Sequence, residues 1–144
     1  MSVYLDTSVL VSMWVQDAHS EYIDHWCAGL DEPMLVSNWA AAEFTSALGA
    51  RQRNASLTPE ESESAELALD GWLAAGVDTI DLVAADVSLA RRLMRASSTP
   101  LKAPDALHLA ATRRTGATLA TLDRPLQRAA ESLGLATVDF GAFG

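Results

Sequence analysis

The sequence is poor in cysteine and contains no long hydrophobic run. Cys27 is its single cysteine, so no disulfide can form within the chain and a reducing compartment is expected. No apolar stretch approaches the roughly 20 residues that a membrane-spanning helix needs. Residues 1–6 lack the basic segment that opens a secretory signal peptide. These absences predict a cytoplasmic protein with no membrane segment.

Several ligand-binding signatures are also absent. His19, His25 and Cys27 do not have the spacing of a zinc finger, and no second pair of ligands accompanies them. The eight glycines form neither a Walker loop nor a dinucleotide-binding fingerprint. No serine or threonine lies in a nucleophile elbow. The sequence therefore argues against a zinc site, these phosphate-binding loops and acyl transfer.

Basic residues are scarce in the first two thirds of the chain. The net charge is −9, which is atypical of a general nucleic-acid-binding protein. Residues 1–90 contain two basic residues against fifteen acidic ones, whereas residues 91–144 contain eight basic residues against four acidic ones. The second region predicts either an unevenly charged solvated surface or a local basic face, and charge alone leaves both open.

The length and the hydrophobic pattern predict one α/β domain. A chain of 144 residues with 49 % hydrophobic residues fits a single domain, residues 1–144, with its own core. Short apolar runs alternate with segments of helical periodicity, which favours a parallel sheet covered on both faces. The expected strands are residues 3–5, 34–36, 79–83, 117–122 and 136–138.

Capping residues predict where the helices begin and end. Thr58 followed by Pro59 and two acids is a strong helix start, and Gly116 is a typical helix end. Seven helices are expected. The first begins at Thr7 or Ser8, the second spans residues 20–30, the third runs from Ser37 or Asn38 to residue 53, and the fourth runs from 58 to 76. The fifth begins near Asp86, the sixth runs from residues 102–105 to 116, and a short seventh helix precedes residues 136–138.

Four acids lie where strands end or helices begin. Asp6 and Asp123 each end an apolar strand, Asp105 begins a helix, and Glu43 lies about one turn into the helix after the second strand. Ligands of open parallel sheets bind beyond the carboxyl ends of the strands, so these carboxylates are expected to converge. Clustered carboxylates repel one another unless a cation intervenes, and oxygen ligands favour Mg²⁺ or Mn²⁺. Such ions can activate water against a phosphodiester.

Each acid taken alone also has a simpler explanation. Asp105 can favour a helix dipole, Asp6 and Asp123 can be turn residues, and Glu43 can be an exposed helix acid. The spacing of the acids is therefore suggestive rather than decisive.

Other acid-cluster α/β proteins fit the sequence poorly. A phosphatase of the haloacid dehalogenase type needs Asp-x-Asp after its first strand, but residues 6–8 are Asp-Thr-Ser. A receiver domain needs an aspartate after its third strand, but residues 84–85 are alanines.

The residues around the four acids resemble the PIN domain family. The resemblance is in order, covers essentially the whole chain and rests on four segments: 3–8 (VYLDTS), 38–44 (NWAAAEF), 102–111 (KAPDALHLAA) and 118–123 (TLATLD). In its length and in the residues of its motifs, the chain is most similar to the VapC-type toxins of bacterial toxin–antitoxin pairs.

This resemblance implies a three-layer α/β/α fold with a five-stranded parallel sheet. It also implies a Mg²⁺-dependent (or Mn²⁺-dependent) endoribonuclease that forms a homodimer and is inhibited by a small cognate antitoxin. Asp6 and Asp105 would bind the metal, Glu43 would bind it or orient the attacking water, and Asp123 would complete the cluster or hold a second ion. Cleavage would leave a 5′-phosphate and a 3′-hydroxyl. The alternative is a catalytically silent PIN-fold module that binds RNA or protein, against which the complete set of acids argues.

Neighbouring side chains are candidates for supporting roles. The hydroxyls of Thr7, Ser8 and Thr121 would hold the carboxylates, with helix capping or strand packing as the equal alternative. His108, three residues after Asp105, is expected to be packed or hydrogen-bonded rather than catalytic. The four tryptophans are expected in core or subunit packing. The basic residues expected along an RNA path, or against an acidic antitoxin segment, are Arg91, Arg92, Arg95, Lys102, Arg113, Arg114, Arg124 and Arg128.

Overall fold

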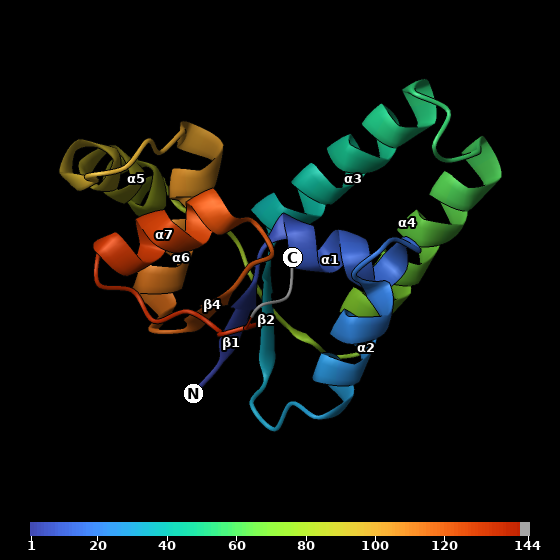
Figure 1. Ribbon diagram of the computed structural model, residues 1–144, viewed down its shortest axis with the longest axis horizontal. Helices are drawn as coiled ribbons and strands as arrows, with labels where there is room; N and C mark the ends of the chain where they lie inside the picture. The colour runs from blue at the N-terminus through green and yellow to red at the C-terminus, as the bar shows by residue number, and fades with distance from the viewer. Residues whose placement is uncertain (142–144) are drawn as a thin grey trace.

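Four parallel strands form the central sheet of the computed structural model, which describes residues 1–141 (Figure 1). The last three residues of the expected 1–144 domain lie outside the described residues. The strand order is β3-β2-β1-β4, and every pairing is parallel. The strands are β1 (Val3–Leu5), β2 (Met34–Ser37), β3 (Asp78–Ile80) and β4 (Thr118–Ala120).

Helices cover both faces of this sheet, so the expected three-layer α/β/α fold is confirmed. Side chains alternate between the faces of a strand. Val3 and Leu5 therefore belong to the core beneath α1–α4, whereas Tyr4 belongs to the core beneath α5–α7 (Figure 1). The helices are α1 (Thr7–Trp14), α2 (Ser20–Ala28), α3 (Asn38–Arg53), α4 (Pro59–Ala74), α5 (Ala84–Ala96), α6 (Ala103–Thr115) and α7 (Arg124–Ser132).

The expected fifth strand, residues 136–138, is reduced to a single bridge. Thr137 pairs in parallel with Leu119, and two backbone hydrogen bonds, from Leu119 to Ala136 and from Val138 to Leu119, hold the segment beside β4. The placement of this segment was therefore right and its assignment as a strand was wrong, because only Thr137 bridges to β4.

The third strand is shorter than the expected residues 79–83. It ends at Ile80 because side-chain oxygens, rather than a neighbouring strand, accept hydrogen bonds from the backbone N–H groups that follow. The N–H of Leu82 donates to Asn38 Oδ1 at 2.9 Å, and that of Val83 donates to Asp86 Oδ2 at 2.9 Å. The second of these bonds also explains why α5 begins at Ala84, two residues before Asp86.

Local capping sets most helix boundaries. The Thr58 hydroxyl accepts from the Glu61 N–H and the Glu61 carboxylate accepts from the Thr58 N–H, so the predicted start of α4 is confirmed. Gly116 ends α6 with a φ of 68°, a conformation that glycine adopts without steric cost. The prediction of a Thr7 or Ser8 cap was wrong, because Asp6 accepts from the Val9 N–H and caps α1 itself.

The structure accounts for three of the tryptophans as packing residues. Trp14 contacts Trp72 with ring centroids 5.6 Å apart, and Trp26 contacts Phe140 at 5.1 Å. Among the residues described, no helix is both long and apolar enough to cross a membrane.

Candidate functional site

The direction in which the chain moves across the sheet reverses between β1 and β4. From β1 the chain passes to β2 and then β3 on one side, and β4 returns to the other side of β1. The carboxyl ends of two strands at such a reversal border a crevice where ligands of open α/β sheets bind. Asp6 follows β1 directly, while Thr121 and Asp123 follow β4, so these three residues lie at this crevice.

Asp6 is the most enclosed of the four acids, with 3 % of its surface exposed. Its Oδ1 accepts from the Ser8 hydroxyl at 2.6 Å and from the Val9 N–H at 3.1 Å, and its Oδ2 accepts from the Thr121 hydroxyl. Burial raises the pKa of Asp6, and the nearby His108 and the two hydroxyls oppose only part of this rise. Asp6 is therefore fixed in orientation but costly to ionise.

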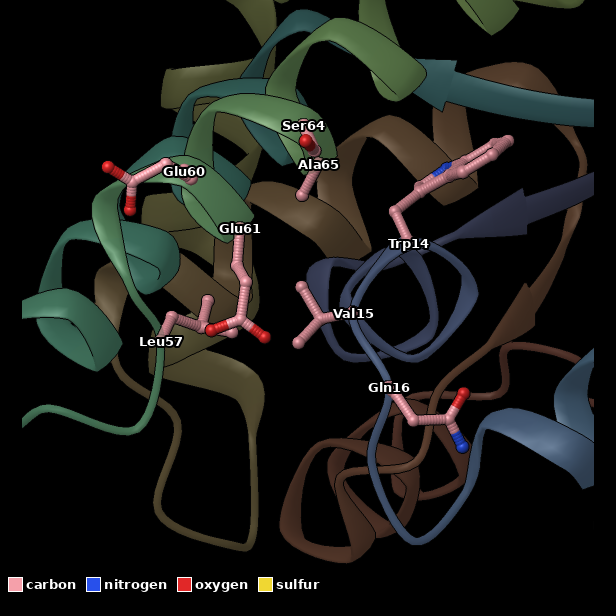
Figure 2. A pocket seen from close by; sticks show the side chains of 8 residues that line it. All are labelled: Trp14, Val15, Gln16, Leu57, Glu60, Glu61, Ser64 and Ala65. Atoms are coloured by element: carbon pink, nitrogen blue, oxygen red, sulfur yellow. The ribbon is translucent and has the colours of Figure 1, made fainter.

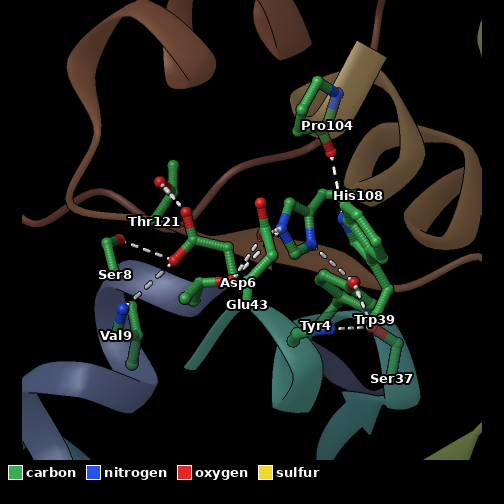
Figure 3. A network of polar contacts seen from close by, with 12 residues as sticks. Tyr4, Asp6, Ser8, Val9, Ser37, Trp39, Glu43, Pro104, His108 and Thr121 are labelled. Atoms are coloured by element: carbon green, nitrogen blue, oxygen red, sulfur yellow. Dashed lines mark hydrogen bonds and ion pairs between the residues drawn. The ribbon is translucent and has the colours of Figure 1, made fainter. Parts of the chain in front are cut away.

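Glu43 is held by a chain of hydrogen bonds that crosses the sheet (Figure 3). Its Oε1 lies 2.5 Å from His108 Nε2, and His108 Nδ1 lies 2.7 Å from the Tyr4 hydroxyl, which lies 2.7 Å from Ser37 Oγ. The Thr7 hydroxyl donates to the same Glu43 oxygen at 2.7 Å. One carboxylate oxygen of Glu43 is thus occupied by neighbours.

His108 is buried and hydrogen-bonded, as the sequence predicted, but its partner is one of the candidate acids. Its side chain is 2 % exposed and that of Glu43 is 26 % exposed. Burial alone would raise the pKa of Glu43, but the hydrogen bonds from His108 and Thr7 outweigh it and lower that pKa. Glu43 therefore ionises readily, unlike Asp6.

Asp105 lies close enough to Asp123 for the charge of Asp123 to act on its carboxyl group. Asp105 is the third residue of α6 and is partly buried, and within residues 1–141 its carboxylate accepts no hydrogen bond. Burial raises the pKa of Asp105 most, the charge of Asp123 adds to it, and His108 opposes it. Glu43 and Asp6 contribute smaller increases. Asp123 caps α7 by accepting from the Leu126 N–H at 3.1 Å.

The sequence thus placed all four acids at one edge of the sheet, and the structure brings Asp105 within electrostatic reach of the other three. Among residues 1–141, however, no three His, Cys, Asp or Glu side chains are already arranged to hold a metal ion. The donors fit Mg²⁺ or Mn²⁺ in kind, because they are carboxylate oxygens, and burial and then the charges of the other three acids raise the pKa of Asp105. Metal binding would therefore require side chains of this cluster to adjust.

The hydroxyls expected to support the acids contact two different carboxylates. Ser8 and Thr121 donate to Asp6, whereas Thr7 donates to Glu43. Ser8 also accepts from the Leu122 N–H at 2.9 Å, which ties the segments after β1 and β4 together, and Thr121 accepts from the Asp123 N–H at 3.0 Å. The role of these hydroxyls in a metal site stays a prediction.

Two of the expected RNA-contact residues are engaged within the fold. Arg114 donates to both oxygens of Asp86, at 2.7 and 3.0 Å, and Arg113 donates to the Leu133 carbonyl at 2.7 Å. The remaining members of that set are exposed: Arg91, Arg92, Arg95, Lys102, Arg124 and Arg128.

Two hollows flank α1. One, of about 360 Å³, lies between the end of α1 and the start of α4, away from the four acids; Figure 2 shows Trp14 and Glu61 lining it. In the part of the chain that the structure describes, Trp14 Nε1 is buried and has no hydrogen-bond partner. The other, of about 400 Å³, begins at Thr7, Ser8 and Asp123 and reaches Arg51.

Sequence reasoning did not single out Arg51 or the link between His108 and Glu43. Arg51 lies in the acidic two thirds of the chain, where the charge count directed attention elsewhere. The spacing of Glu43, Ala47 and Arg51, four residues apart on one helix, was the available signal.

Comparisons with known proteins give one consistent result. The family model described as PIN domain matches residues 3–132. No curated protein matches the sequence.

Solved structures with a similar fold include toxins and toxin–antitoxin complexes. Mycobacterium tuberculosis VapC20, a toxin that cleaves the sarcin–ricin loop, has a TM-score of 0.74 at 19 % identity, covering 94 % of this chain and 98 % of that one. Rickettsia felis VapBC2, bound to a promoter DNA fragment, has a TM-score of 0.69 at 18 % identity, and the match covers 96 % of this chain and 98 % of that one. Neisseria gonorrhoeae FitAcB has a TM-score of 0.69 at 20 % identity, and the match covers 95 % of this chain and 96 % of that one.

Proposed function

The chain belongs to the PIN domain family, and we propose from this premise that it is a metal-dependent endoribonuclease, the toxin of a bacterial toxin–antitoxin pair. The observation that carries the proposal is the convergence of four carboxylates at the crevice between β1 and β4. The pKa of Asp105 is raised by burial and by the charges of Asp123, Glu43 and Asp6, which is unfavourable unless a cation binds among them. Such a cluster suits phosphodiester hydrolysis.

The proposed roles follow from the contacts of each acid. Asp6, fixed by Ser8 and Thr121, and Asp105, which has no hydrogen-bond donor within residues 1–141, would hold Mg²⁺ or Mn²⁺. When bound, the ion supplies an activated water and positive charge against the phosphodiester. Glu43 would accept a proton from the attacking water or complete the ligand set, and Asp123 would complete it from the other strand.

The network behind Glu43 would keep that carboxylate in one orientation. His108 Nε2 lies 2.5 Å from Glu43 Oε1 and the Tyr4 hydroxyl lies 2.7 Å from the other ring nitrogen, so both ring nitrogens are engaged and the imidazole is fixed in orientation. The second oxygen of Glu43 then remains available to the crevice.

The partners in this proposal are an RNA substrate and a small cognate antitoxin, with the toxin a cytoplasmic homodimer. Support comes from solved complexes with the same fold, among them a VapBC-1 complex from nontypeable Haemophilus influenzae with a TM-score of 0.65 at 14 % identity. Likeness at this level of identity concerns the fold, so the partners are tested separately by copurification with the neighbouring gene product.

The activity itself is tested by incubating purified protein with total RNA and Mg²⁺ or Mn²⁺, against EDTA and an Asp6→Asn variant. We expect cleavage that needs both the metal and Asp6 and leaves a 5′-phosphate. Hydrolysis of a chromogenic phosphate monoester in place of RNA would contradict the nuclease assignment.

A catalytically silent PIN-fold module is the second candidate. The observation that favours it is the absence, in residues 1–141, of three acids already arranged around a metal position. RNA binding by wild type without cleavage of any pool, in either metal, would support this candidate.

A further inference from the structure

The groove that begins at the acids is also lined by an arginine, Arg51. Its volume is about 400 Å³, and Thr7, Ser8 and Asp123 line it beside the crevice while Ala47 and Arg51 line it along α3. Glu43, Ala47 and Arg51 are spaced by four residues, so they share one face of that helix. The rise of a helix places the Cα atoms of Glu43 and Arg51 about 12 Å apart.

Arg51 is a partly buried cation without an acidic partner. Within residues 1–141 the ion pairs are His108 with Glu43 and Arg114 with Asp86, and Arg51 takes part in neither. Its hydrogen bonds there use its backbone, whose carbonyl accepts from Ser56. Because no acid pairs with Arg51 within these residues, its guanidinium is available to an anionic ligand in the groove.

Two acids, Asp17 and Asp123, line the same groove, and within residues 1–141 neither forms an ion pair with Arg51. Asp17 Oδ1 accepts from the His19 N–H at 2.8 Å and from the Ser20 hydroxyl at 3.2 Å, and its Oδ2 accepts from the Ser12 hydroxyl at 3.0 Å. Both oxygens are therefore occupied by donors that hold the loop between α1 and α2.

We propose that this groove is a phosphate-binding subsite for the RNA strand, in which Arg51 binds a backbone phosphate that flanks the scissile bond. The inference rests on the proposed function and adds to it a strand path along α3. A ligand that reaches from the acids to Arg51 must carry phosphates on an extended chain, so the site selects a polynucleotide over a mononucleotide. Because a planar guanidinium suits bidentate contacts with phosphate, arginine is well matched to this position.

The subsite is tested by fluorescence anisotropy with a labelled random-sequence 20-nucleotide RNA in EDTA, which separates binding from cleavage. We expect Arg51→Gln to weaken RNA affinity by about 5–10-fold and to reduce the slope of log K against log salt by about 0.7. Arg51→Lys is expected to recover part of the affinity, because the charge remains.

Arg53→Gln is the matched control. Arg53 is exposed on the same helix, and its guanidinium lies over Gly49 of α3 rather than in the groove. The loss of affinity at this position is expected to be less than about twofold, because a single exposed charge is screened by salt.

The outcomes distinguish the subsite from the nuclease assignment. Equal affinities of wild type and Arg51→Gln, in a protein that cleaves RNA with metal, overturn the subsite and leave the proposed function intact. Equal losses of RNA affinity in Arg51→Gln and Arg53→Gln would mean that only the net charge matters, and this result also overturns the subsite. Wild type that neither binds nor cleaves RNA overturns both.

Discussion

Two of the candidate acids have raised pKa values for reasons that differ in detail. Asp6 accepts three hydrogen bonds and caps α1, whereas Asp105 accepts none within residues 1–141 and is opposed by the charge of Asp123. Loss of charge therefore has different consequences at the two positions. Asp6→Asn would place an amide N–H opposite the Thr121 hydroxyl, where a carboxylate oxygen now accepts from it. Asp105→Asn would remove a carboxylate that the charge of Asp123 repels.

Asp105→Asn should stabilise the metal-free protein at neutral pH. We expect Tm in EDTA to rise by about 1–3 °C, because the substitution removes a carboxylate that burial and neighbouring acids destabilise. Asp6→Asn should lower Tm or leave it unchanged, since it loses the bond from Thr121. A clear decrease in the Tm of Asp105→Asn would assign Asp105 a structural role instead.

The pH dependence of this gain has a defined sign. The folded chain keeps a proton on Asp105 at pH values above the ordinary 3.8 at which the unfolded chain has lost it, so wild-type stability falls as pH rises through that window. The advantage of Asp105→Asn in denaturant melts should be complete above the window and should vanish below pH 3.8. An advantage independent of pH would reject the electrostatic explanation.

Tyr4 links the sheet to the side chain of Glu43. Tyr4→Phe removes a hydroxyl that lies 2.7 Å from both Ser37 Oγ and His108 Nδ1, and it leaves two buried polar groups without this partner. We expect a loss of about 1–3 kcal/mol in the free energy of unfolding. The control is Tyr22→Phe, whose hydroxyl makes a longer 3.3 Å contact with the Phe140 carbonyl. Similar losses in urea melts of the two variants would contradict a special role for this network.

At the scale of elements, one ion pair fastens α6 to the start of α5. Asp86 is buried, its Oδ1 accepts from Arg114 Nε at 2.7 Å, and its Oδ2 accepts from the Val83 N–H at 2.9 Å. Burial alone would raise the pKa of Asp86, but these contacts outweigh it and lower that pKa. Arg114 therefore has a structural role, and its contact with RNA stays a prediction.

Asp86→Asn should destabilise the fold by about 1–3 kcal/mol at neutral pH, because it weakens a buried, charge-assisted contact. Because the pKa of Asp86 is lowered in the folded chain, its contribution is present above the unfolded value and is lost as pH falls through the folded one. The difference between wild type and variant in urea melts should thus disappear at strongly acidic pH. Asp81→Asn, at an exposed neighbouring position, should leave stability within about 0.5 kcal/mol of wild type.

The sequence predicted the elements well where caps and apolar runs agree. Thr58, Pro59 and Gly116 set helix limits through local chemistry, and Val3–Leu5 is apolar throughout. The ends of β3 and the weak fifth strand were missed because they depend on partners distant in the sequence. Asn38 captures the backbone of residue 82, and residues 136–138 meet β4 at a single bridge.

At the scale of the whole molecule, the sheet order explains why four distant acids meet. The motifs identified these residues, and the reversal between β1 and β4 places them at one crevice. The hydrogen-bond chain from Ser37 to Glu43 was not predictable in the same way, since it joins residues on two strands and two helices. The place of Arg51 in the groove was likewise hidden by the net charge of −9.

The most direct test of the account is calorimetric titration of Mn²⁺ into wild type, Asp105→Asn and Asp139→Asn. Asp139 lies in the final segment, and its carboxylate accepts from the Gly141 N–H rather than facing the crevice acids. The account predicts that Asp105→Asn binds Mn²⁺ at least about 10-fold more weakly than wild type, while Asp139→Asn binds as wild type does. Equal affinity in all three proteins, or no binding by wild type, would contradict a metal centre among Asp6, Glu43, Asp105 and Asp123.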